Sequence, residues 1–362
     1  MNAVIDPRDY SLVGRDSKLA VEQGLATAEW YACPIPRKRL KELMKRTDGP
    51  AIRDTLVWFG YFAAFGLGGY VFWGTWWCVP FFAAYGVLYG SSSDSRWHEC
   101  GHGTAFRTRW MNDAIYQIAS FMVLREPTPW RWSHTRHHTD TIIVGRDPEI
   151  AVPRPPDILG IFLSLLILKS GPKEIRRVFL HVFGRLHPEE REYIPEMEHP
   201  KVFRTARIWV AIWAATAGVS LYLGSFLPLM YVGVLPSIYG GWLYLVFGLT
   251  QHAGMAEDVL DHRLNSRTVY MNPVFRFLYW NMNYHVEHHM FPMVPYHRLP
   301  ELHEEMKPYS PPAYKGLLDA YREIVPALVK QTKDPSYHVV RKLPENARPL
   351  EVPAAQPSFA AA

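Results

Sequence analysis

The stretch TLVWFGYFAAFGLGGYVFWG, residues 55–74, contains no charged side chain and is as long as a helix that crosses the apolar core of a bilayer. Residues 75–90, TWWCVPFFAAYGVLYG, follow it without a charge. A second uncharged pair occupies residues 208–224 and 225–250. These runs predict an all-α integral membrane protein with four transmembrane helices in two hairpins, interfacial helices and a cytosolic helical cap. A soluble bundle with buried apolar helices is the alternative.

Basic residues flank these runs. PRKRLKELMKR at 36–46 precedes the first run, and most of the other Lys and Arg residues lie between Arg96 and Arg207 or after His262. The positive-inside rule therefore places both termini and the central segment in the cytoplasm. Two shorter apolar runs, at 114–124 and 158–168, predict helices that lie in the interface or half-buried under the cap.

The composition excludes several classes of protein. A net charge of +5 without a basic, aromatic face gives no nucleic-acid signal. Three scattered cysteines, Cys33, Cys78 and Cys100, form neither a disulfide framework nor a thiolate metal site. We expect three parts, namely a cytosolic segment with a basic juxtamembrane helix (1–53), a membrane and catalytic domain (54–300), and a cytosolic helix with a Pro/Ala-rich tail (301–362).

Histidines gather in three short motifs. HTRHH at 134–138 and HVEHH at 285–289 share one spacing, for which chance predicts roughly 0.03 matches, and HECGH at 98–102 adds a pair. On a helix, histidines three or four residues apart share one face. His252 follows the fourth apolar run directly, on the same side as the others.

The resulting set exceeds the coordination sphere of one ion, so the sequence predicts a centre with two ions and an open position. Imidazole ligands are compatible with iron, copper, nickel or zinc. The predicted ligands are His98, His102, His134, His137, His138, His252, His285, His288 and His289. Glu99, Asp147 and Glu287 are predicted to hold the second ring nitrogens of these histidines.

The ordered motifs HECGH, HTRHH, QHAG and NYHVEHHMFP, spread between two apolar pairs, resemble the membrane fatty acid desaturase and hydroxylase superfamily. The resemblance covers residues 55–300, and parts of it are similar to the bacterial rhizopine-catabolism oxygenase branch. It implies a non-haem diiron centre on those nine histidines, O2 as co-substrate and a bacterial inner-membrane location.

The resemblance also implies oxidation of unactivated C–H bonds, most simply those of an acyl chain, by desaturation or hydroxylation. A hydroxylase or demethylase of a small polar methylated compound is the alternative. A histidine-rich zinc membrane protein is an alternative of another class. Because the chain shows no dinucleotide fingerprint and no cysteine cluster, we expect a separate ferredoxin or rubredoxin-like electron donor with its own reductase.

Overall fold

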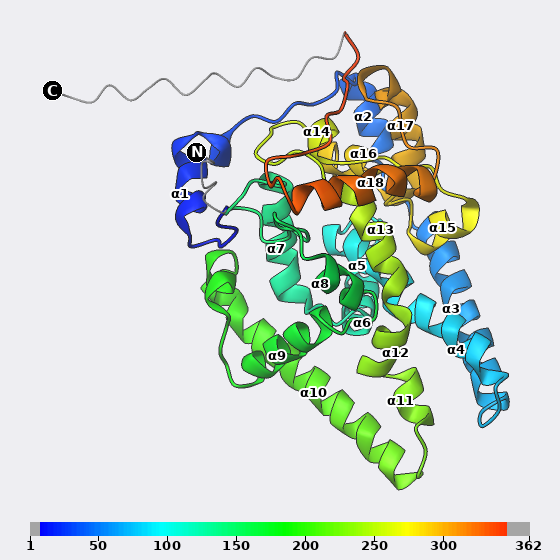
Figure 1. The fold of residues 1–362 in the computed structure, drawn as a ribbon. Helices are drawn as coiled ribbons and strands as arrows, with labels where there is room; N and C mark the ends of the chain where they lie inside the picture. The colour runs from blue at the N-terminus through cyan, green and yellow to red at the C-terminus, as the bar shows by residue number, and fades with distance from the viewer. Residues whose placement is uncertain (1–7, 346–362) are drawn as a thin grey trace.

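The computed structural model describes residues 8–345, which form a body of helices joined by short loops (Figure 1). Over this range no β-strand forms, and extended chain pairs only in two isolated bridges, Thr268 with Tyr284 and Val269 with Tyr314. The predicted all-helical fold is confirmed. The α-helices are α1 (Arg15–Glu22), α2 (Arg37–Leu43), α3 (Gly49–Val71), α4 (Cys78–Gly86), α5 (Ser93–His102), α6 (Arg109–Met122), α7 (Pro127–Thr139), α8 (Ile158–Ser164), α9 (Ser170–Val182), α10 (His199–Tyr222), α11 (Leu227–Tyr231), α12 (Val234–Gly240), α13 (Trp242–His252), α14 (His262–Asn265), α15 (Pro273–Leu278), α16 (His285–Met290), α17 (Leu299–Met306) and α18 (Leu317–Gln331).

The charge-free runs do not form four uninterrupted spans. Residues 225–250 are divided among α11, α12 and α13, because Pro228 opens α11 and Gly233 takes a left-handed backbone with φ of 96° before α12. Among residues 8–345, none of the helices combines the length and the apolar character needed to cross a membrane. The four transmembrane helices predicted from the sequence are not borne out among these residues.

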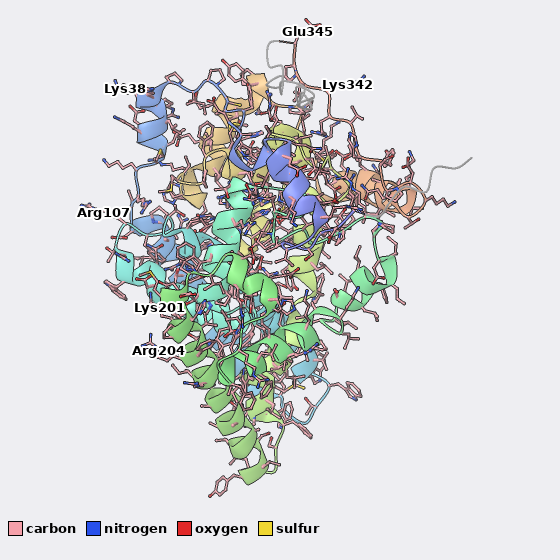
Figure 2. All side chains as sticks on the ribbon, turned by 90° about the vertical axis from the view of Figure 1, so that its left-hand side faces the viewer. Lys38, Arg107, Lys201, Arg204, Lys342 and Glu345 are labelled. Atoms are coloured by element: carbon pink, nitrogen blue, oxygen red, sulfur yellow. The ribbon has the colours of Figure 1, made fainter. Side chains whose placement is uncertain are left out.

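The two predicted pairs nevertheless exist as neighbouring helices. α3 lies beside α4 and α10 beside α11, and both pairs project from the helical body (Figure 1). Large apolar and aromatic side chains near their ends are exposed, among them Trp76, Trp77, Leu221, Tyr222 and Phe226. Lys201 and Arg204 point outward from the end of α10 that is nearer the body (Figure 2).

The two projecting pairs are joined by a close helix crossing. A Cβ on Gly240 of α12 would lie 1.8 Å from the carbonyl oxygen of Gly86 on α4, and one on Gly90 would lie 2.7 Å from the nitrogen of Gly241. Glycine at these positions lets the two backbones touch. The contact fixes α12, and hence α13 after it, against the helix that leads to the first histidine motif.

Helical structure continues from α4 into α5 through a π-helical segment, Val87–Ser92. Such segments are rare and frequent at functional sites. The continuity carries His98 and His102 past the apolar run.

The shorter apolar runs form α6 and α8. One face of α6 is buried, with Ile115, Tyr116 and Ala119 packed in the same core as Trp97 of α5 and Trp130 of α7. On α8, in contrast, Leu159 and Phe162 are exposed. α6 thus supports the helices that carry two of the histidine motifs, as expected for a half-buried helix.

Residues 301–345 contain most of α17, all of α18 and a final segment without regular secondary structure. The remainder of the predicted Pro/Ala-rich tail, and the first residues of the predicted N-terminal segment, lie outside the described residues.

Candidate metal centre

Four helices bring the nine predicted histidines together. α5 supplies His98 and His102, the first motif, and α13 ends on His252. The second and third motifs lie on α7 and α16, which supply His134, His137, His138, His285, His288 and His289. Each motif presents its histidines on one helix face, because residues three and four apart are neighbours there. The helices meet in the body of the protein, above the projecting pairs (Figure 1).

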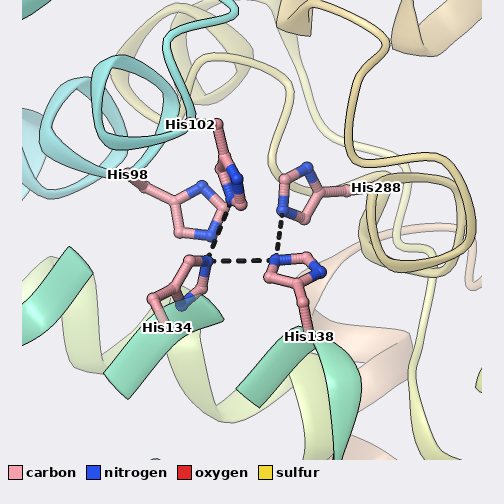
Figure 3. A group of neighbouring side chains, drawn as sticks. All are labelled: His98, His102, His134, His138 and His288. Atoms are coloured by element: carbon pink, nitrogen blue, oxygen red, sulfur yellow. Dashed lines mark hydrogen bonds between the residues drawn. The ribbon is translucent and has the colours of Figure 1, made fainter. Parts of the chain in front are cut away.

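The first group contains His98, His102, His134, His138 and His288, whose ring nitrogens converge within 4.8 Å of one another. The Nε2 atoms of His102 and His138 lie 3.0 Å and 3.1 Å from that of His134. The Nε2 atom of His288 lies 3.1 Å from that of His138. Figure 3 shows these rings around a common centre.

The second group contains His137, His252 and His289, again within 4.8 Å. His285 adjoins it, because its Nε2 lies 2.9 Å from that of His252 and 3.0 Å from that of His289. His138 and His289 stack at 4.4 Å between ring centroids, so the two groups are adjacent. The structure thus brings all nine predicted residues together; their role as ligands stays a prediction.

The contacts within the first group cannot all be hydrogen bonds. A neutral imidazole nitrogen either donates one proton or accepts one. Three contacts link the Nε2 atoms of His102, His134, His138 and His288 in a row, and at most two of these contacts can be hydrogen bonds. A cation at the centre would satisfy every lone pair. At about 2.1 Å from the ion, ligands at right angles are separated by about 3.0 Å, which matches these distances.

The electrostatics of the cluster also favour metal binding. Burial, followed by repulsion among the rings, holds the pKa of most of these histidines well below its ordinary value. Burial lowers the pKa of both His102 and His252 to about 3. The rings are therefore neutral at pH 7, the form that binds metal ions. His137 differs, because Asp147 outweighs burial and raises its pKa.

A carboxylate and a backbone carbonyl orient two of the rings. Asp147 accepts a hydrogen bond of 2.8 Å from Nδ1 of His137, as predicted. Nδ1 of His252 donates to the backbone oxygen of Asn265 at 2.8 Å. In both rings the proton on Nδ1 leaves Nε2 with a free lone pair directed into the cluster.

Glu149 was missed by the sequence analysis. Its carboxylate lies 2.8 Å from Nδ1 of His134 and accepts from Ser133, and burial raises its pKa to about 7. His134, His137 and Glu149 also form a third set with metal-binding geometry. The signal in the sequence is that Glu149 lies only two residues beyond Asp147; in the structure it also donates its backbone N–H to that carboxylate.

The other two predicted carboxylates behave differently. Oε1 of Glu99 is 3.9 Å from Nδ1 of His98 and 3.7 Å from Nδ1 of His288, beyond hydrogen-bond distance. Glu287 contacts no histidine of the cluster; it binds Nδ1 of His303 and the hydroxyl of Thr268. The prediction for Glu287 is wrong, because a residue two positions after His285 lies on another face of α16.

A cavity of about 450 Å³ adjoins the cluster, a size typical of small-molecule sites. His98, His134, His137, His252 and His285 form part of its wall. Apolar residues, including Trp97, Trp130, Ile150 and Leu249, line it together with charged residues from α5, α9 and the loops around α7. A bound molecule would therefore touch the histidine cluster directly.

An all-helical fold with two adjacent histidine groups beside a cavity is an arrangement that could hold metal ions. A family model described as fatty acid desaturase matches residues 74–320, and the chain belongs to this family.

The curated relatives are distant. The chain is similar to an omega-3 fatty acid desaturase, chloroplastic, of Glycine max (24% identical, 73% of this chain and 60% of the relative). It is also similar to a Delta(12)-oleate desaturase of Trichosanthes kirilowii, with 25% identity over 62% of this chain and 68% of the relative. A Delta(5) fatty acid desaturase of Caenorhabditis elegans is 24% identical over 56% of this chain and 51% of the relative. The chain thus spans about three fifths of the length of the first of these relatives.

Proposed function

We propose that this protein is an O2-dependent non-haem diiron oxidoreductase of the desaturase type, which oxidises unactivated C–H bonds. The observation that carries the proposal is the convergence of nine histidines from four helices into two groups beside one cavity. Family membership supports the same chemistry.

The five-histidine group and the group of His137, His252, His289 and His285 would each hold one iron ion. The two iron ions, when bound, would supply the oxidation of the C–H bond by O2. The chain's own part is to hold the rings with Asp147, Glu149 and the Asn265 carbonyl, and to place the target carbon in the cavity. Removal of two hydrogens from adjacent carbons would give an alkene, and oxygen insertion would give an alcohol.

The first candidate substrate is an acyl chain, because the relatives are named as fatty acid and oleate desaturases. A second candidate is a small polar methylated compound, oxidised by hydroxylation or demethylation. The charged residues in the cavity wall favour this second class, because an acyl chain needs an apolar tunnel. Product analysis with acyl lipids and with methylated polyols and amines would separate the two.

We also propose that the protein works at a membrane, with the histidine cluster on the cytoplasmic side of a bacterial inner membrane. Exposed Trp76, Trp77, Leu221 and Tyr222 at the projecting ends support contact with lipid. Flotation with liposomes tests this, and a protein that stays in the aqueous fraction would contradict it.

A separate ferredoxin or rubredoxin-like protein with a reductase is proposed as the electron donor. The absence of a cysteine cluster from the sequence supports an external source. Turnover of the purified chain with NADPH alone would contradict it.

The histidine assignment is tested by His137→Ala, with His338→Ala as the control because His338 is an exposed residue outside the cluster. We expect His137→Ala to lose iron from the second group and to lose O2-dependent product, while the folded protein remains. Metal analysis and O2 consumption measure both effects. Two zinc ions without iron or O2 consumption in the unaltered protein would overturn the proposal in favour of a zinc protein.

A further inference from the structure

Arg125 presents unused hydrogen-bond donors to the cavity beside the histidine cluster. It lies in the loop between α6 and α7, and its side chain is 35% exposed and lines the cavity. Leu124 before it has a left-handed backbone, with φ of 57°. A non-glycine residue adopts this conformation only where the surrounding structure imposes it. The backbone therefore holds Arg125 in this place at a conformational cost.

The guanidinium of Arg125 makes one ion pair. Its Nη1 donates to Asp94 at 3.0 Å, and within residues 8–345 no other hydrogen bond from this guanidinium is formed. The rings of Trp97 and Tyr244 lie 4.7 Å and 5.3 Å from its central carbon, so the guanidinium makes a cation–π contact with each. Arginine carries five N–H donors in a rigid fork, and most of these remain free to meet a ligand.

Apart from Lys173, which is exposed, the other charged side chains of the cavity wall are already paired. Arg154 pairs with Glu257 at 3.2 Å, and Arg177 pairs with Glu174 at 3.1 Å. Both oxygens of Glu149 are taken by Ser133 and His134. Binding of a ligand to Arg125 therefore does not require an existing contact to break.

The position of Arg125 determines how far a group bound to it would lie from the histidine cluster. Asp94, its partner, lies one helical turn before His98 on α5. One turn advances about 5.4 Å along the axis. A group bound to Arg125 would therefore lie near the first histidine group, and a carbon only a few bonds away from it would reach the cluster.

We propose that Arg125 binds an anionic oxygen group of the substrate, such as a carboxylate, sulfate or phosphate, and so selects small organic anions for oxidation close to that group. The inference rests on the proposed function and names the class of its substrate. Arginine suits this role because its fork binds such groups through two parallel hydrogen bonds. The wall residues Trp130, Ile150 and Leu249 would enclose a short apolar part of the same molecule.

The test measures binding to the full-length, metal-free protein in detergent by calorimetry. The probes are hexanoate, its uncharged analogue hexan-1-ol and its methyl ester. We expect hexanoate to bind at least about tenfold more tightly than either neutral probe, as hydrogen bonds to charged groups contribute. Arg125→Gln should remove this preference. Equal binding of all three probes, or an unchanged preference in Arg125→Gln, would overturn the proposal.

Two further variants guard against a general loss of structure. Arg131→Gln is the matched control, since Arg131 also lies over a ring, that of Tyr116, and near Asp113 at 3.8 Å, but does not line the cavity. It should keep the preference. Asp94→Asn removes the negative charge beside Arg125 and weakens its hydrogen bond to the guanidinium, so it should strengthen hexanoate binding. Weaker binding in Asp94→Asn with an intact fold would contradict the proposal.

Iron content and O2 consumption are measured separately on the iron-loaded protein. Two bound irons and O2 consumption without any preference for the anion would remove the Arg125 proposal and leave the proposed function standing. Anion binding without iron loading would remove the proposed function and leave only the binding of anions by Arg125.

Discussion

Asp147 is the side chain that links the second histidine motif to the loop after it. One carboxylate oxygen accepts from Nδ1 of His137 and from the backbone N–H of Ile142, each at 2.8 Å, and the other accepts from the N–H of Glu149. The same residue thus sets the tautomer of a predicted ligand and the shape of the loop that carries Glu149. Partners of this kind tune the affinity of a metal site.

Asp147→Asn should therefore weaken metal binding by about 10- to 100-fold, because an amide no longer fixes the proton on Nδ1 of His137. Competition for iron with a chromogenic chelator measures the change. Asp140→Asn is the control, since Asp140 pairs with Arg146 and accepts no bond from the cluster. If both variants retained the affinity of the unaltered protein, Asp147 would have no role in metal binding.

His181 lies outside the cluster and is completely buried between two carboxylates. Its Nε2 lies 2.9 Å from Glu190, and its Nδ1 contacts Glu126 just before α7. Burial alone lowers the pKa of His181, but the hydrogen bonds and charges of Glu126 and Glu190 outweigh it and raise the pKa to about 9. The ring is therefore charged at neutral pH and ties α9 to the start of α7.

This pKa predicts a loss of stability at alkaline pH. Because the folded-state pKa exceeds the ordinary value, the stabilisation is complete below about pH 6.5 and disappears as pH rises through about 9. At about 1.4 kcal/mol per pKa unit, the loss is at most a few kcal/mol. Denaturant unfolding between pH 6 and 10 measures it. His181→Gln should flatten this dependence, and an equally steep loss in that variant would assign it to other groups.

At the scale of elements, the crossing of α4 and α12 controls the arrangement of the helices around the site. α12 leads within a few residues to α13, which ends on His252, and the π-helical segment after α4 leads to α5 with His98. The backbones touch at Gly86 and Gly240, so a side chain at either position would separate the helices. The crossing thereby sets the distance between the first histidine motif and His252.

Gly240→Ala should destabilise the fold by at least about 1–3 kcal/mol, because its Cβ would lie 2.0 Å from the carbonyl carbon of Gly86 and the backbone cannot move aside freely. Gly218→Ala on α10 is the matched control: no atom lies within 4 Å of its Cβ position, so the change should be neutral or stabilising by up to about 1 kcal/mol. Thermal unfolding in detergent compares the two. Equal melting temperatures would show that α4 and α12 can separate without cost.

At the scale of the whole molecule, the cluster joins four segments that are far apart in the sequence, from His98 to His289. Without an ion, neutral rings face one another with unsatisfied lone pairs, and neither ring nitrogen of His98 has a hydrogen-bond partner among the described residues. Unpaired buried polar groups cost stability. The fold should therefore be most stable with metal bound.

Loading the purified protein with ferrous iron should raise its melting temperature, and chelation should reverse the rise. The increase should shrink in His137→Ala and persist in His338→Ala. Differential scanning calorimetry under anaerobic conditions measures it. A melting temperature independent of metal in the unaltered protein would contradict a ligand role for the cluster.

Much of the site could be predicted from the sequence because its signals are local. The spacing of HTRHH and HVEHH fixes which rings share a helix face, whatever the rest of the chain does. Asp147 was also predicted from its place shortly after the second motif. The prediction for Glu287 failed for a local reason as well. Glu287 lies between predicted ligands in the sequence, but its side chain points toward α17, where it binds His303.

The sequence by itself determined the helical class and the nine histidines that gather, because both follow from composition and from spacing along single helices. Only the tertiary structure decided how those rings divide between two groups, that Glu149 rather than Glu287 holds one of them, and that the run from 225 to 250 breaks into three helices. It also placed Arg125 in the cavity. These features depend on contacts between segments distant in sequence, and such contacts are fixed by packing rather than by any local pattern.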